Sequence, residues 1–176
     1  MLKPGKGHRR FHQVYRDNRV LGSLCAVIFL TQLGFGSIVP VVPLYAREFG
    51  VSQSAIGLTI AVYGLARFLV SMPTGWLADR LGRRWTLVLG EVATAAGNLL
   101  CGLSATSEQF LVFRFLAGAG SAMVLTSGQI SLADVATPAN RGRVMGIYQG
   151  VFLFAVGFGP LPGGLLAERF GLSAPF

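Results

Sequence analysis

The chain alternates long apolar runs with short polar connections. Each run is close to or longer than the roughly 20 residues that a helix needs to cross the hydrocarbon core of a bilayer. The strands of a membrane barrel are about half as long, so the pattern excludes a barrel. Five runs in succession also disfavour a soluble protein with buried helices. We therefore predict an all-α, polytopic membrane helical bundle with five spans, at residues 20–45, 51–78, 85–103, 109–132 and 144–167.

Composition indicates the same class of protein. Of 176 residues, 52% are hydrophobic and 12% are charged, whereas a soluble domain is about 25% charged. The polar stretch 1–19 precedes the first run, which is too long for a signal peptide and lacks a small-residue cleavage site. We expect that run to remain as a membrane helix.

The predicted organisation is a basic arm at 1–19, a transmembrane part at 20–170 and the start of a further helix at 171–176.

The distribution of Lys and Arg predicts the orientation, because these residues stay on the cytoplasmic side of a membrane when they lie in short loops. Eleven of the 15 fall on one side of the predicted topology, in the arm and in the second and fourth connections. The opposite loops hold Arg47 and Arg169. The pattern predicts a cytoplasmic amino terminus and is typical of a bacterial inner membrane.

Several function classes are disfavoured. The net charge of +8 follows the membrane topology, and the basic arm has few aromatic residues to stack on nucleic-acid bases; it suits anionic lipid headgroups of the bilayer instead. Cys25 and Cys101 fall inside spans, where a free cysteine behaves as a small apolar residue. His8 and His12 have no neighbouring ligand cluster. We expect no metal, no cofactor and no nucleic acid, and the absence of a nucleophile–base pair or acid dyad disfavours an enzyme.

A charged segment, GWLADRLGRR, connects the second and third spans and is the most specific motif in the chain. Its brevity and charge predict a tight cytoplasmic turn. It resembles the signature loop after the second helix of the major facilitator superfamily of transporters. The residues that carry the resemblance are Gly75, Leu77, Ala78, Asp79, Arg80, Gly82, Arg83 and Arg84.

The resemblance implies two six-helix halves with a substrate site between them. Each half is built from inverted three-helix repeats, and the halves rock against one another. We expect this chain to be the amino-terminal portion of such a transporter, with a carboxyl-terminal half as its missing partner.

Two further segments resemble motifs of drug and metabolite antiporters in this superfamily. In the fourth span an arginine precedes a G-x-G pattern, with Ala117 where the family often has Gln and Phe110 where it often has Leu. In the fifth span glycines flank a proline, and Ala155 replaces a family glycine. Pro160 lacks an N–H and should bend its helix, while glycines let another backbone approach closely. The transport-associated candidates are Arg114, Gly118, Gly120, Gly146, Gly159, Pro160, Gly163 and Gly164.

Charged and polar side chains inside the spans are further candidates, because a charge in the bilayer is costly and usually has a partner or a function. Arg114 lies in a cavity or snorkels to the outer interface. Arg67 and Glu91 form a pair across the hairpin of spans two and three, or else Arg67 snorkels while Glu91 is protonated or faces the other half. The first span has no carboxylate, which leaves proton coupling open. It offers possible cavity residues instead: Thr31, Gln32 and Phe35.

The resemblance also implies a conformational gate. Asp79 would cap a helix of the other half, where exposed N–H groups favour a carboxylate. Arg83 would pair with Asp134 at the cytoplasmic end of the fourth span. The leading hypothesis is a secondary transporter that exports small amphipathic molecules. The alternatives are an importer of the same superfamily and a non-transporting, truncated membrane protein or scaffold.

Overall fold

The computed structural model describes residues 6–48, 50 and 52–176, and the side chains among them from residue 20 onward. The side chains of the predicted basic arm, including His8 and His12, therefore lie outside the described part. Throughout the described residues the regular structure is helical, as the sequence predicts. The elements are α1 Lys6–Ile38, α2 Val42–Glu48, α3 Gln53–Leu81, α4 Arg83–Gly102, α5 Ser107–Val135, α6 Arg141–Phe158 and α7 Pro160–Phe170.

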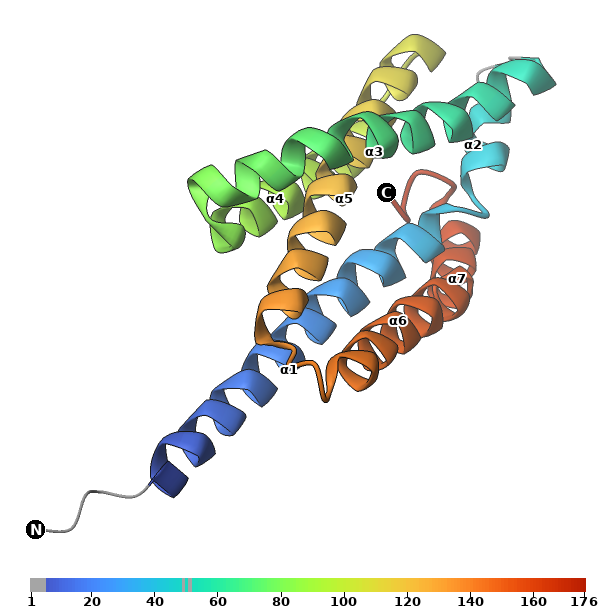
Figure 1. Cartoon of the computed structure of the whole chain (residues 1–176). Helices are drawn as coiled ribbons and strands as arrows, with labels where there is room; N and C mark the ends of the chain where they lie inside the picture. The colour runs from blue at the N-terminus through green and yellow to red at the C-terminus, as the bar shows by residue number, and fades with distance from the viewer. Residues whose placement is uncertain (1–5, 49, 51) are drawn as a thin grey trace, which may run out of the picture.

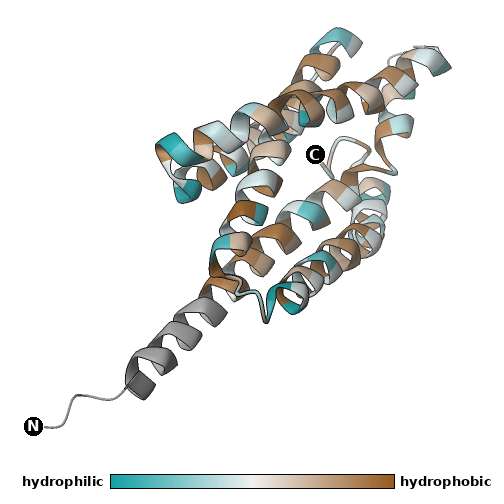
Figure 2. Ribbon diagram, viewed as in Figure 1, coloured by the Kyte–Doolittle hydropathy of each residue, from teal (hydrophilic) through white to brown (hydrophobic). Residues whose placement is uncertain are grey.

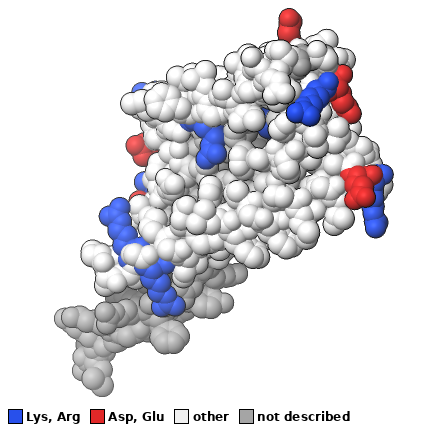
Figure 3. All heavy atoms as spheres, turned by 90° about the vertical axis from the view of Figure 1, so that its right-hand side faces the viewer, with Lys and Arg blue, Asp and Glu red and all other residues white. Residues whose placement is uncertain are grey.

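Long apolar helices dominate the structure (Figures 1 and 2). Four of the described helical segments are long and apolar enough to cross a membrane: Val20–Ile38, Gln53–Leu81, Ser107–Val135 and Arg141–Phe170. The remaining predicted span, the third at 85–103, corresponds to α4, which carries two arginines at its start and Glu91 near its middle. On the face drawn in Figure 3, most charged atoms lie near the edges and the broad surface between them is uncharged. This is the surface expected of a protein that faces lipid.

The predicted first span is divided in the structure. Helix α1 ends at Ile38 and α2 begins at Val42, so the run 20–45 is not one continuous helix. Pro40 lies in the connection and Pro43 is the second residue of α2. A proline inside a helix removes a backbone donor, whereas in the first turn its missing N–H costs nothing. The two prolines therefore end one helix and begin the next.

The charged segment between α3 and α4 is mostly helical, which corrects the prediction of a turn spanning it. Helix α3 continues through Leu81 and α4 begins at Arg83. Gly82 alone connects them, with φ 86° and ψ 146°. Residues with a side chain rarely adopt a positive φ, so the reversal depends on glycine at this position. The charges consequently project from two helix ends.

Helices α6 and α7 form one bent span, as the proline predicts. The residue between them, Gly159, keeps helical dihedral angles, and its N–H donates to the Ala155 carbonyl at 2.9 Å. Pro160 cannot donate to the Val156 carbonyl. That carbonyl faces α1, where a Cβ on Gly36 would come within 2.6 Å of its oxygen. The bend thus brings α1 and the α6–α7 span into backbone contact.

Helix α5 is the central element, packed between α3 and α4 and also touching α1. Two apolar clusters lie toward opposite ends of the bundle. One joins α1, α5 and α6 at the end where α5 passes into α6; the other joins α1, α2, α4 and α5 at the opposite end. Their buried members are Leu24, Ile28, Leu125, Leu132, Val144 and Tyr148 in the first, and Ile38, Val41, Val42, Tyr45, Cys101 and Phe110 in the second.

Candidate transport site and cytoplasmic gate

Arg114 of α5 lies inside the bundle. It is 3% exposed, which excludes the snorkelling arrangement. Its guanidinium carbon lies 5.1 Å from the ring centre of Tyr63 and 5.9 Å from those of Phe110 and Phe176. Rings attract a cation through their negative faces. Arg114 thus occupies an aromatic cage, and within the described structure its Nε has no hydrogen-bond partner.

A second guanidinium shares this aromatic surface. Arg67 of α3 lies 6.0 Å from the ring centres of both Phe35 and Tyr63, and these two rings stack at 5.2 Å. Among the described side chains, the one ion pair is Arg83–Asp134, so Arg67 and Glu91 are not paired. Neighbouring helices alone do not make a pair, because both side chains must also face one another around their helix axes.

The three predicted cavity residues of α1 have different surroundings. Phe35 joins the aromatic surface. The Thr31 hydroxyl forms a hydrogen bond with the Glu91 carboxyl of α4. Gln32 is 1% exposed, and both polar atoms of its amide lack a partner among the described residues. A buried amide without a partner is costly, which keeps Gln32 a candidate for binding a polar group.

The candidate gate residues gather where α3 passes into α4. Arg83 and Asp134 form the predicted ion pair, with side chains 40% and 43% exposed. Arg80 lies over the Trp76 ring at 4.0 Å, and Asp79 is exposed on the last turn of α3. Gly75 has open space around it. Because Arg83 is in α4 and Asp134 is in α5, the pair joins the ends of two packed helices.

Some glycines of the two antiporter-like motifs pack against a neighbouring helix, and others have open space beside them. A Cβ on Gly118 would lie 2.6 Å from the Tyr63 carbonyl oxygen, and one on Gly120 would lie 2.6 Å from that of Gly90. On the bent span, Gly159 and Gly163 pack against Ser37 of α1, whose hydroxyl donates to the Gly159 carbonyl at 2.9 Å. Within the two antiporter-like motifs, the glycines with open space are Gly146 and Gly164.

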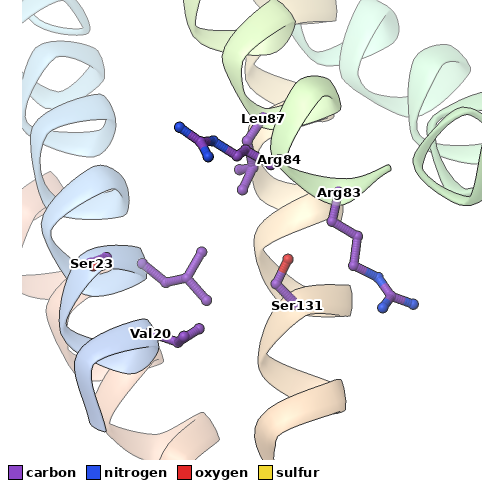
Figure 4. A pocket seen from close by; sticks show the side chains of 7 residues that line it. Val20, Ser23, Arg83, Arg84, Leu87 and Ser131 are labelled. Atoms are coloured by element: carbon purple, nitrogen blue, oxygen red, sulfur yellow. The ribbon is translucent and has the colours of Figure 1, made fainter. Parts of the chain in front are cut away.

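A pocket of about 620 Å³ opens between α1, α4 and α5 near the Arg83–Asp134 pair. Figure 4 shows Arg84 directed toward α1 and Arg83 directed away from it. The pocket is lined by Val20, Ser23, Leu24, Arg83, Arg84, Leu87 and Ser131.

Sequence analysis missed several residues that build these sites. Tyr63 lies beside both Arg67 and Arg114 and stacks on Phe35, yet an isolated tyrosine in an apolar run carries no signal of its own. Gly90 and Gly97 have no side chain, so α5 packs directly against the backbone of α4 at these positions. Their spacing of seven residues is a recognisable small-residue pattern.

Comparison with known proteins agrees with this arrangement. A sequence model of the Major Facilitator Superfamily matches residues 24–176. An uncharacterized MFS-type transporter of Methanocaldococcus jannaschii is 32% identical over 148 residues, which are 84% of this chain and 38% of the relative. Multidrug resistance protein 1 of Bacillus subtilis is 29% identical over 153 residues, which are 87% of this chain and 39% of the relative. Quinolone resistance protein NorA of Staphylococcus aureus is 27% identical over 141 residues, which are 80% of this chain and 36% of the relative.

A solved structure has a similar fold. It is a bacterial homolog of the human lysosomal transporter Spinster, crystallised in an inward-facing and unoccupied conformation. The TM-score is 0.77 at 25% identity, over 86% of this chain and 32% of that protein. The chain spans less than two fifths of the length of the relatives it matches. With a family match across most of its residues and the same helical arrangement, this polytopic membrane chain belongs to the Major Facilitator Superfamily.

Proposed function

We propose that the protein is a secondary transporter that exports small amphipathic molecules by alternating access. The buried Arg114 in its aromatic cage carries the proposal. Rings supply an apolar, planar surface and the guanidinium supplies donors, which is the mixture typical of small-molecule sites. The multidrug and quinolone resistance proteins among the relatives support export over import.

The Arg83–Asp134 pair and Asp79 would form the cytoplasmic gate. The pair holds the ends of α4 and α5 together beside the exposed Asp79. A second helical half would place a helix amino terminus against Asp79, where a carboxylate is favoured. These contacts would stabilise the state that is closed to the cytoplasm. A coupling of about 1–3 kcal/mol shifts such an equilibrium roughly 5- to 150-fold.

The bent α6–α7 span would complete the contact with that second half. Its packed glycines face α1, while Gly146 and Gly164 have open space. Small residues let another backbone approach closely, so a helix of the second half would pack there and exclude water.

We also propose that the amino terminus lies in the cytoplasm and that the protein resides in an inner membrane. The clustering of Arg80, Arg83 and Arg84 at one helix junction supports this orientation. A reporter enzyme inserted after Arg84 should be active in the cytoplasm, and one inserted after Ser104 should be active outside. The reverse pattern would reject the orientation.

The transport site is tested by changing Arg114 in the complete transporter. Arg114→Ala should abolish efflux of a fluorescent amphipathic dye while the amount of protein in the membrane stays nearly normal, because removing the charge eases insertion. Arg114→Lys should restore part of the activity, since an ammonium lacks the planar fork. Arg169→Ala, at the exposed end of α7, is the matched control. Normal efflux by Arg114→Ala would reject the site, and dye accumulation by the wild type would indicate an importer.

A further inference from the structure

The hydrogen bond between Thr31 and Glu91 raises a question of proton count. The Thr31 hydroxyl lies 2.8 Å from the Val27 carbonyl oxygen, a contact within α1. The same hydroxyl also contacts the Glu91 carboxyl of α4. A threonine hydroxyl has one proton to donate but can accept as well.

Both contacts are full hydrogen bonds if Glu91 carries a proton. The hydroxyl then donates to Val27, and the carboxylic acid donates its own proton to Thr31 Oγ1. If Glu91 is ionised, the single hydroxyl proton has to serve two acceptors. A neutral acid also avoids the cost of an unpaired charge in the bilayer.

The charged groups on the surrounding helices do not supply Glu91 with a counter-ion. Arg67 of α3 and Arg114 of α5 lie over aromatic rings, and Arg83 pairs with Asp134. Arg84 is seven residues before Glu91, about 10 Å along the helix. The other charged groups of the described part lie at helix ends: Arg47 and Glu48 on α2, Asp79 and Arg80 on α3, Glu108 on α5, Arg141 and Arg143 on α6, and Glu168 and Arg169 on α7. Within α1, residues 20–38 carry no charge, and Cys25 is their one titratable group.

A pocket lies one helical turn from Glu91 along α4. The pocket between α1, α4 and α5 is lined by Leu87, one helical turn before Glu91, and by Leu24, two turns before Thr31. At 1.5 Å per residue, Leu87 is about 6 Å from Glu91 along the axis. Arg84 and Ser23 also line the pocket (Figure 4). It therefore runs between the two helices that carry the pair.

We propose that Glu91 and Thr31 form an intramembrane proton-binding site that exchanges protons with the cytoplasmic side through this pocket. In the neutral state the Glu91 O–H donates to Thr31. On ionisation the proton leaves to water in the pocket, and the Thr31 hydroxyl turns from Val27 to donate to the carboxylate. The assignment depends on the geometry of α1 and α4 and does not require that transport be demonstrated.

Infrared spectroscopy of the purified chain in lipid vesicles tests the protonation. The carbonyl stretch of a protonated carboxylic acid should be present at neutral pH and should be lost on raising the pH. Glu91→Gln, which keeps the shape of the side chain, should remove the band. Glu108→Gln, at the exposed start of α5, should leave it. A band that persists in Glu91→Gln, or no band in the wild type, would overturn the assignment.

A second measurement uses the wild type and does not depend on how a variant folds. A hydrophobic carbodiimide reacts with protonated carboxyl groups, and mass spectrometry locates the adduct. We expect the adduct at Glu91 and not at Glu108. Labelling that spares Glu91 would contradict its protonation.

The route is tested by hydrogen–deuterium exchange of the acid band. Leu87→Trp fills the pocket and should slow the exchange several-fold. Val88→Trp is the matched control, since Val88 is the next residue and is 44% exposed. Equal exchange rates in the two variants would overturn the route through the pocket.

Discussion

The two faces of α4 are built in opposite ways. Toward α5, Gly90 and Gly97 bring the backbones into contact: a Cβ on Gly97 would lie 2.5 Å from the Ala117 nitrogen. Toward α1, the same helix presents Arg84, Leu87 and Glu91, and the space between the helices contains a pocket. One face is closely packed, whereas the other is more open and carries two ionisable side chains, Arg84 and Glu91.

The difference shows how one helix serves two purposes. Between membrane helices, lipid tails are as apolar as side chains, so close packing rather than hydrophobic burial drives association. The glycine face can therefore fix the position of α4. The α1 face is then free to carry a carboxyl group and a pocket, features that would weaken a packing surface.

The largest expected effect is on the packed face. Gly97→Leu should lower the free energy of unfolding by about 3 kcal/mol or more, because the side chain has no room beside α5. Gly64 on the exposed surface of α3 has open space beside it, so Gly64→Leu should change the free energy of unfolding by about 0.5 kcal/mol or less. Denaturant unfolding of the purified chain in detergent measures both. Similar losses in the two variants would contradict the contrast between packed and open surfaces.

A smaller effect is expected on the α1 face. Thr31→Val removes the partner of the Glu91 carboxyl and should cost about 1–3 kcal/mol, since a partly buried polar group is left unsatisfied. Thr59→Val is the control, because the Thr59 hydroxyl bonds only to the Ile56 carbonyl of its own helix, at 2.7 Å. The comparison uses the same unfolding measurement. If Thr31→Val costs no more than Thr59→Val, the bond to Glu91 contributes nothing to stability.

The smallest effect is expected where the packed face reaches the start of α4. Arg83 and Asp134 are 40% and 43% exposed, and an exposed ion pair contributes about 0.2–1 kcal/mol. A double-mutant cycle on unfolding with Arg83→Ala and Asp134→Ala should show a coupling of this size that weakens in high salt. Strict additivity of the two changes would reject the pair.

The sequence by itself determined the helices, their approximate bounds and the family. Membrane helices satisfy their backbone groups locally, so apolar length alone reveals them. The Arg83–Asp134 pair was also predictable, because both residues lie at helix ends on one side of the membrane. The bend at Pro160 follows from the missing N–H of proline. The break before α2 has the same local cause, although its prolines were placed within one span.

The tertiary structure decided which way each helix faces. Arg67 and Glu91 lie on the two helices of one hairpin, yet one lies over aromatic rings and the other bonds to Thr31, 60 residues away. Depth follows from counting residues, but rotation about a helix axis is set by contacts such as Gly97 with Ala117 and Gly118 with Tyr63. The aromatic cage of Arg114 and the Glu91–Thr31 bond each join side chains from different helices. Such sites depend on packing between distant segments, which the order of residues along the chain does not specify.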